Sequence, residues 1–260
     1  LHLSLRRQRQ MCIRDSDGTL TNDNPGGIIT QNTLDTLQKL KDNGHFVAIA
    51  SGRAQYLALE AAKISGIDNL VTDGGNGITL NGKLKYIKPL DRQKALEIID
   101  EALVQGYPVN VAIDNSPRLY SSNTKQPQNQ THRLILDENF DYHQVKDIYK
   151  IFITIKEDEE QKLSKLKTLG YMRYFEDGII IEPDDKYQGI VEMVKLIEGD
   201  LKDIVVFGDG HNDYTMFKQA PISIAMGNAI EELKEIATFV TKDNQHDGIT
   251  YACRHFGWIK

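Results

Sequence analysis

The sequence predicts an α/β fold, a doubly wound parallel sheet into which an α+β domain is inserted. Short apolar runs rich in Val and Ile alternate with segments of helical periodicity, which is typical of βα units. Glycines at positions 44, 66 and 199 stand just past three predicted helices, where a helix C-terminus favours them. The middle of the chain has a different pattern and separates two halves of the sheet domain.

The predicted elements follow one another along the chain. Helices are predicted at 31–43, 53–65 and 186–198, and strands at 46–50, 69–72, 179–181, 204–207, 222–225 and 239–241. Asn81-Gly82 between two apolar runs predicts a β-hairpin. The middle then reads as a helix at 92–105, strands at 109–113 and 149–155, a polar loop at 116–131 and a helix at 159–168. We therefore expect a core formed by residues 1–82 and 179–260, and an α+β insertion at 83–178.

Composition and charge exclude several classes of protein. The chain has 260 residues, 40% of them hydrophobic and 26% charged, as in soluble globular proteins. Its longest apolar runs have about five residues, whereas a membrane span needs roughly 20. The net charge is −6, although residues 1–14 carry four arginines and no acid, so the remaining body is acidic and nucleic acid is not an expected partner. Cys12 and Cys253 cannot form a disulfide framework, and a cytoplasmic location is expected.

Polar residues follow several of the predicted strands, at the end where open α/β sheets bind their ligands. The hexapeptide DSDGTL from Asp15 to Leu20 combines two carboxylates with a glycine, and by itself fits an Asp-Gly turn equally well. Ser51 begins a Ser-Gly-Arg segment that suits a phosphate site, although taken alone it fits a structural helix N-cap better. Lys186 opens a predicted helix, where a single lysine is usually just solvated.

The motif GDGHND at 208–213 is the most specific of these groups. Asp209 and Asp213 place carboxylates at a strand end and at the next helix start, which suits a hard cation. A dinucleotide fingerprint is a weak alternative, because Asp213 stands where a third small residue is needed. We interpret His211 as a loop residue and Asn228 as packing at the rim. The sequence has no HxxxH, HExxH or GxSxG motif, so neither a zinc site nor a Ser-His-Asp hydrolase is expected.

Together, these groups resemble the haloacid dehalogenase superfamily of phosphohydrolases. DSDGTL matches its DxDGT(L) motif, Ser51 its Ser/Thr motif, Lys186 its lysine motif, and residues 209–213 its acidic motif. GDGHND followed by AMGNA at 225–229 is similar to the Cof-type subfamily in particular. The resemblance implies a Rossmann-like core, and the insertion between Ser51 and Lys186 corresponds to the C2-type cap of that subfamily.

The resemblance also implies a phosphatase mechanism that passes through an aspartyl-phosphate. Asp15 is expected to attack phosphorus, and Asp17 to protonate the leaving oxygen and then to deprotonate water. Mg²⁺ is expected to be held by Asp15, by the backbone carbonyl of Asp17 and by Asp209, with Asp213 supporting the metal or its waters.

The remaining family residues are expected to bind phosphate. Ser51 and Lys186 would hold the phosphoryl oxygens, and Asn212 would orient Lys186 or the phosphate. The expected substrate is a small phosphorylated metabolite, such as a sugar phosphate. A phosphosugar mutase of the same superfamily would share all these motifs. A phospho-accepting signalling receiver also uses an acidic cluster, a hydroxyl and a lysine, but it resembles a bare sheet domain without an insertion.

The segment before Asp15 departs from the family pattern. A central parallel strand should be almost continuously apolar, whereas arginines at 6, 7, 9 and 14 interrupt this one. The stretch from Arg6 to Ser16 also matches the translation of a transposase-type sequencing-library adapter. We therefore expect residues 1–16 to be non-native and native sequence to begin near Asp17, so that Asp15 fits the motif by position only. Residues 11–15 are still expected to pair as a truncated first strand.

Overall fold

The structure is a computed structural model. It describes residues 10–14, 16–21, 27–126, 132–183 and 185–260, with the backbone alone at 10–14, 16, 17, 174 and 175. The chain divides into a core unit, Leu1–Tyr86 with Asp185–Lys260, and an inserted unit, Ile87–Asp184. Within the described ranges, every helix is too short or too polar to cross a membrane.

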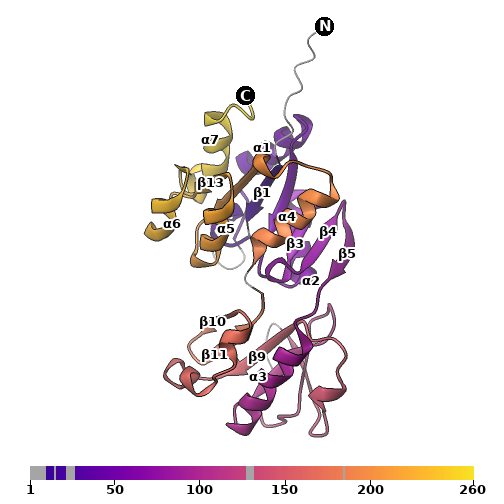
Figure 1. Ribbon diagram of the computed structural model, residues 1–260. Helices are drawn as coiled ribbons and strands as arrows, with labels where there is room; N and C mark the ends of the chain where they lie inside the picture. The colour runs from indigo at the N-terminus through magenta and orange to yellow at the C-terminus, as the bar shows by residue number, and fades with distance from the viewer. Residues whose placement is uncertain (1–9, 15, 22–26, 127–131, 184) are drawn as a thin grey trace. The chain divides into compact units, whose positions relative to one another are not determined.

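An eight-stranded, mainly parallel sheet forms the centre of the core unit (Figure 1). Its strands are, in order across the sheet, β14 (Phe239–Val240), β13 (Ile222–Ala225), β12 (Ile204–Gly208), β1 (Gln10–Arg14), β2 (Phe46–Ala50), β3 (Leu70–Thr72), β4 (Gly77–Leu80) and β5 (Lys83–Ile87). The strands from β14 to β3 run parallel, and β4 returns antiparallel to β3. Because β1 lies between β2 and β12, the prediction that this segment pairs as the first strand is confirmed for residues 11–14.

Apolar side chains alternate between the two faces of this sheet. Val47 and Ile49 of β2 belong to one hydrophobic cluster, whereas Ala48 and Ala50 belong to another. The first cluster includes residues of α1 (Gln31–Asp42), α2 (Gln55–Ser65) and α7 (Gly248–His255), and the second includes residues of α4 (Lys186–Leu196), α5 (Tyr214–Gln219) and α6 (Glu231–Ile236). Helices therefore cover both faces, and the predicted doubly wound architecture is confirmed.

The inserted unit has its own sheet and its own core. The sheet order is β10 (Tyr171–Phe175), β11 (Gly178–Ile181), β9 (Lys150–Thr154), β6 (Val109–Ala112), β7 (Arg118–Ser121) and β8 (Arg133–Leu136). All neighbours are antiparallel except β7 and β8. Buried residues of α3 (Arg92–Val104) recur with helical spacing at Ala95, Ile98, Ile99 and Ala102 and belong to the same cluster as the inward residues of the sheet. Lys150 and Glu182 form a buried ion pair beside this sheet.

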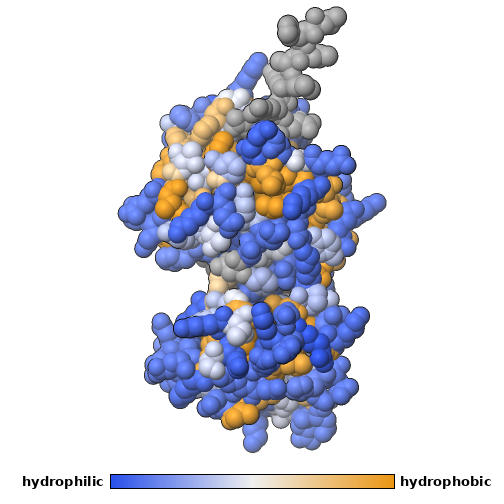
Figure 2. Space-filling view, in the orientation of Figure 1, coloured by the Kyte–Doolittle hydropathy of each residue, from blue (hydrophilic) through white to orange (hydrophobic). Residues whose placement is uncertain are grey.

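Short turns connect these elements. A π-helical turn, η1 (Ser16–Leu20), follows β1. The 3₁₀ turns are η2 (Asp73–Gly75), η3 (Tyr142–Gln144), η4 (Glu157–Lys162), η5 (Leu166–Thr168), η6 (Leu201–Asp203), η7 (His211–Asp213) and η8 (Asn244–His246). On the face shown in Figure 2, hydrophilic residues cover most of the surface of each unit, as expected when the apolar side chains are gathered in cores.

The unit boundaries differ from the predicted ones at 82/83 and 178/179. The strand at Lys83–Ile87 pairs with β4 and extends the core sheet, so the predicted hairpin lies at the end of the core unit. The strand predicted at 179–181 as part of the core is β11, which pairs with β9 and β10 in the inserted unit. The turn at Glu176 and Asp177 makes β10 and β11 a hairpin, and the sequence analysis did not identify β10.

The predicted helix at 159–168 is replaced by η4 and η5. Glu101 of α3 accepts hydrogen bonds from the backbone N–H groups of Ser164 and Lys165, at 2.9 Å in both cases. These N–H groups are therefore directed away from the carbonyls that a continuous α-helix would offer them. Since Glu101 lies far away along the chain, local periodicity could not reveal this competition.

Candidate active site

The carboxyl ends of three neighbouring strands bring the predicted site residues to one edge of the core sheet. The turn η1 follows β1, Ser51 follows β2, and Asp209 follows β12. Because β1 is hydrogen-bonded to both β2 and β12 in parallel, these ends lie side by side. The position agrees with the ligand-binding edge of open α/β sheets.

Direct contacts join η1 to the loop after β12. Thr19 Oγ1 donates a hydrogen bond of 2.6 Å to Asp209 Oδ1, although the two residues are 190 positions apart. Gly18 has a φ of +87°, and a Cβ at this position would lie only 2.2 Å from Asp209 Oδ2. Only glycine combines this backbone conformation with so close an approach.

Asp213 holds the loop that carries Asp209. Its side chain is fully buried, and Oδ2 accepts hydrogen bonds from the backbone N–H groups of Asp209 (2.9 Å) and Gly210 (3.2 Å). The other carboxylate oxygen, Oδ1, lies 3.6 Å from Lys186 Nζ. Two charges buried in this way must compensate each other, so the pair fixes both the loop and the lysine.

Lys186 is 2% exposed although it is the first residue of α4. Its Nζ also donates to the backbone carbonyl of Asn212 at 3.2 Å, so Asn212 contacts the lysine through its main chain. The start of α4 is held close to the loop after β3, because a Cβ on Gly75 would lie 2.2 Å from the carbonyl oxygen of Asp185. A Gly74-Gly75 pair after a strand signals such an approach, and the sequence analysis did not use it.

Ser51 is completely buried at the end of β2. Its Oγ accepts a hydrogen bond from the backbone N–H of Arg53 at 3.0 Å, and its own N–H donates to the carbonyl of Val71 at 2.8 Å. The alternative interpretation of Ser51 as a helix N-cap is wrong, because α2 begins at Gln55 with Ala54 in the capping position.

Two of the predicted residues cannot be placed in this geometry. Asp15 lies outside the described residues, and so does the side chain of Asp17. Among the residues that are described, His, Cys, Asp and Glu side chains do not gather in threes as a metal site. The structure thus brings together Asp209, Asp213 and Lys186, with Ser51 at the end of β2, on the other side of β1. Thr19, whose hydroxyl contacts Asp209, was not predicted to have a role.

Comparison with known proteins assigns this arrangement to a family. The sequence profile of haloacid dehalogenase-like hydrolases matches residues 12–253. The chain belongs to this family. The predicted resemblance to this family is therefore confirmed.

Relatives and neighbours of this hydrolase match it over nearly their full length. It is 28% identical over 251 residues to the Bacillus subtilis (strain 168) protein named "Putative phosphatase YkrA", covering 95% of this chain and 97% of that protein. It is 25% identical over 252 residues to "5-amino-6-(5-phospho-D-ribitylamino)uracil phosphatase YitU" of the same organism, covering 90% and 93%. A hypothetical protein of Geobacillus kaustophilus HTA426 superimposes with a TM-score of 0.83 at 29% identity, covering 96% and 100%. The chain is therefore a hydrolase of this family, and its relatives YkrA and YitU are named as phosphatases.

Proposed function

We propose that this enzyme is a Mg²⁺-dependent phosphatase that hydrolyses a small phosphorylated metabolite through an aspartyl-phosphate intermediate. The observation that carries the proposal is the contact of η1 with Asp209 beside the buried Lys186–Asp213 pair, because it sets carboxylates and a cation next to the turn that follows β1. The name of YitU supports a small phosphorylated substrate, and a sugar phosphate is the class that we favour.

The residues around Asp209 fit Mg²⁺. Asp209 is half-buried at a strand end and offers carboxylate oxygens, the donor type that Mg²⁺ prefers. Because Gly18 has no side chain, the space beside Asp209 Oδ2 stays open, whereas the Cβ of any other residue would fill it. We propose Asp15, the backbone carbonyl of Asp17 and Asp209 as ligands, with Asp213 supporting them through the loop that it holds. When bound, Mg²⁺ would neutralise charge between the attacking carboxylate and the phosphate.

The chemistry is divided between two aspartates. A carboxylate oxygen of Asp15 would form a bond to phosphorus while the bond from phosphorus to the ester oxygen breaks. Asp17 would give its proton to that leaving oxygen and would then take a proton from the water that attacks the aspartyl-phosphate. This second attack returns Asp15 as a free carboxylate and releases inorganic phosphate, so that both residues recover their initial state.

Lys186 and Ser51 would bind the phosphoryl oxygens. The Asp213 carboxylate compensates the buried ammonium group of Lys186, which supports its role as a fixed cation. The carbonyl of Asn212 directs the same ammonium group, so we propose Asn212 as an orienting residue. A fixed charge of this kind stabilises the transition state without reorganising during the reaction.

The test is phosphate release from a panel of phosphorylated small molecules, with Mg²⁺ and with EDTA. Asp209→Asn should weaken the binding of Mg²⁺, so that half-maximal activity needs more Mg²⁺, and should lower kcat on the order of 1000-fold, because it removes a charged metal ligand. The matched control is Asp200→Asn, near the opposite end of β12, where asparagine caps η6 equally well. An unchanged Mg²⁺ titration in Asp209→Asn would contradict the metal assignment, and absence of phosphate release from the whole panel would contradict the function.

A further inference from the structure

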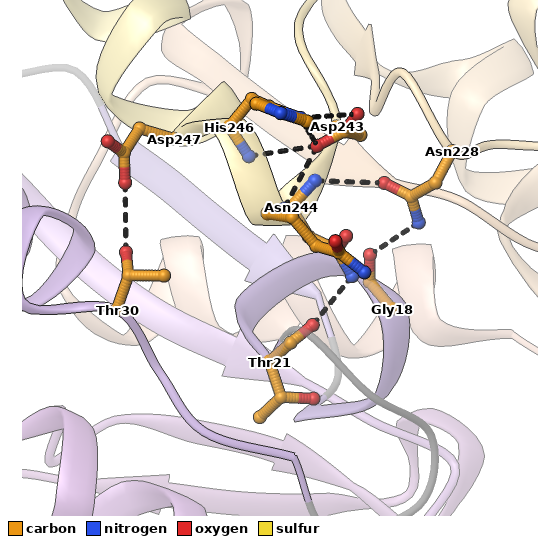
Figure 3. A network of polar contacts seen from close by, with 9 residues as sticks. Gly18, Thr21, Thr30, Asn228, Asp243, Asn244, His246 and Asp247 are labelled. Carbon is orange, nitrogen blue, oxygen red and sulfur yellow. Dashed lines mark hydrogen bonds and ion pairs between the residues drawn. The ribbon is translucent and has the colours of Figure 1, made fainter.

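Asn228 joins the turn η1 to a loop at the far end of the sequence (Figure 3). Its side chain Nδ2 donates a hydrogen bond of 2.8 Å to the carbonyl of Gly18, and its Oδ1 accepts one of 3.1 Å from the backbone N–H of Asn244. The expectation that Asn228 only packs at the rim is therefore wrong. Both polar ends of its amide are engaged, one of them in the turn that touches Asp209.

Asn244 holds the same turn at a second point. Its Nδ2 donates to the carbonyl of Thr21 at 2.7 Å (Figure 3). The carbonyls of Gly18 and Thr21 lie at the middle and just past the end of η1, and each is bound by a side-chain amide. A short turn has few hydrogen bonds of its own, so external donors of this kind restrict its conformation.

The loop that presents Asn244 is itself rigidly built. Asp243 accepts hydrogen bonds from the backbone N–H groups of Gln245 and His246, and its carboxylate lies 2.7 Å from His246 Nδ1. A Cβ on Gly227, the residue before Asn228, would lie 2.5 Å from the backbone nitrogen of Asp243. The two asparagines are therefore carried by backbone segments in direct contact, so neither can shift without the other.

The same loop also fixes the chain before α1. Asp247, in the left-handed conformation with a φ of 56°, accepts hydrogen bonds from Thr30 Oγ1 at 3.0 Å and from Asn32 Nδ2 at 2.7 Å. Residues 243–247 therefore contact the chain at two places, at the end of η1 and at the N-terminus of α1. The side chain of Asp247 thereby links this loop to the residues around the start of α1.

We infer that Asn228 and Asn244 are positioning residues, which hold the carbonyls of η1 so that the aspartates on this segment meet the phosphate in a fixed geometry. The inference rests on the proposed phosphatase function of the same site. Neither asparagine contacts substrate in this role; each acts through the backbone of Gly18 or Thr21. A misplacement of about 1 Å in such a constellation lowers the rate about 100-fold.

The test compares Asn228→Asp with Asn69→Asp. The first change keeps the shape of the side chain but turns the donor into a carboxylate oxygen that faces the Gly18 carbonyl. Asn69 makes the same pair of bonds elsewhere in the core unit, donating to the Val47 carbonyl at 3.0 Å and accepting from the Asn81 N–H at 3.0 Å. Both variants lose one equivalent hydrogen bond, so they should lose similar stability. Asn244→Asp is a second test variant, because it removes only the donor to Thr21.

Two readouts are measured on each purified full-length variant. The first is kcat and KM for p-nitrophenyl phosphate with Mg²⁺. The second is hydrogen–deuterium exchange of peptides that cover residues 17–21. We expect Asn228→Asp and Asn244→Asp to lower kcat by about 10- to 100-fold with KM changed less than about threefold, and to speed exchange in those peptides. Asn69→Asp should keep kcat within about twofold of the unmodified enzyme and leave that exchange unchanged.

The outcomes separate this inference from the proposed function. Equal losses of kcat in Asn228→Asp and Asn69→Asp would overturn it, because a merely structural role predicts that result. Unchanged exchange at residues 17–21 in both test variants would overturn it as well. If the unmodified enzyme fails to hydrolyse any phosphate ester, the proposed function fails, and the exchange comparison still decides whether the asparagines hold the turn.

Discussion

Replacing Gly18 by alanine tests whether η1 must contact Asp209 as closely as it does. The added Cβ would lie 2.2 Å from Asp209 Oδ2 and 2.8 Å from its Cγ. To reach an ordinary van der Waals distance, the carboxylate would have to move by about 1 Å, the scale of misplacement that impairs catalysis. Since Asp209 also accepts the hydrogen bond from Thr19 at 2.6 Å, this movement would break that contact.

The expected loss has two separate components. The left-handed backbone conformation at Gly18 costs an alanine roughly 1–2 kcal/mol, which should appear in the free energy of unfolding. The displaced carboxylate should lower kcat/KM by about 100-fold. The assay is urea denaturation for the first component and Mg²⁺-dependent release of phosphate for the second.

Gly82→Ala is the control that separates these components. Gly82 has a φ of +71°, and a Cβ there would meet nothing within 4 Å. It therefore imposes the same backbone strain in the same unit without a clash. If Gly18→Ala and Gly82→Ala had equal kcat/KM values, the close contact between η1 and Asp209 would not matter for catalysis and the reasoning would be refuted.

Two further predictions concern other contacts of α4. Lys186→Met should lower the free energy of unfolding by about 3–5 kcal/mol, because it breaks a buried ion pair, and should also reduce kcat. Lys195→Met, on the exposed side of α4, should change neither quantity. Equal urea midpoints of the two variants would contradict the stabilising role of Lys186. Burial, together with a 2.6 Å hydrogen bond to the Glu192 carboxylate, raises the pKa of Tyr86 from 10.0 to about 12. The folded state thus keeps the Tyr86 proton to a higher pH than the unfolded state does. The contribution of this protonated hydroxyl to stability is therefore complete below pH 10 and is lost as the pH rises toward 12. The difference in unfolding free energy between the unmodified enzyme and Tyr86→Phe should therefore shrink between pH 9.5 and pH 11.5, and a constant difference would argue against the assigned titration.

Local pattern predicted the core sheet well because its strands are covered on both faces. Buried parallel strands such as β2 and β12 are continuous apolar runs, and a glycine, at 44 or 199, stands shortly after the helix that precedes each of them. A continuous apolar run could not show whether residues 179–181 belong to the core sheet or to the sheet of the inserted unit, since such a run fits a strand of either. The false helix at 159–168 has a non-local cause, the carboxylate of Glu101.

The sequence predicted that Asp209, Asp213 and Lys186 lie at one edge of the sheet, but not how they contact one another. Sequence spacing placed Asp209 and Asp213 near one another, but it could not show that Asp213 turns toward two backbone N–H groups and Lys186. Likewise, the bond from Asn228 to Gly18 depends on tertiary packing between distant segments. The nucleophile assignment to Asp15 and the non-native origin of residues 1–16 stay predictions.

The discontinuous core unit has a consequence for the order in which the chain folds. The inserted unit is one continuous segment, Ile87–Asp184, with its own hydrophobic cluster, so all of its contacts become available as soon as that segment has been synthesised. The core sheet cannot close at that stage, because β1 pairs with Ile204 and the residues that follow it. Pairing between such distant strands is slow, because closing the long loop between them costs entropy before contacts form. During synthesis, the first half of the core sheet must therefore wait with one side of β1 unpaired until β12 leaves the ribosome.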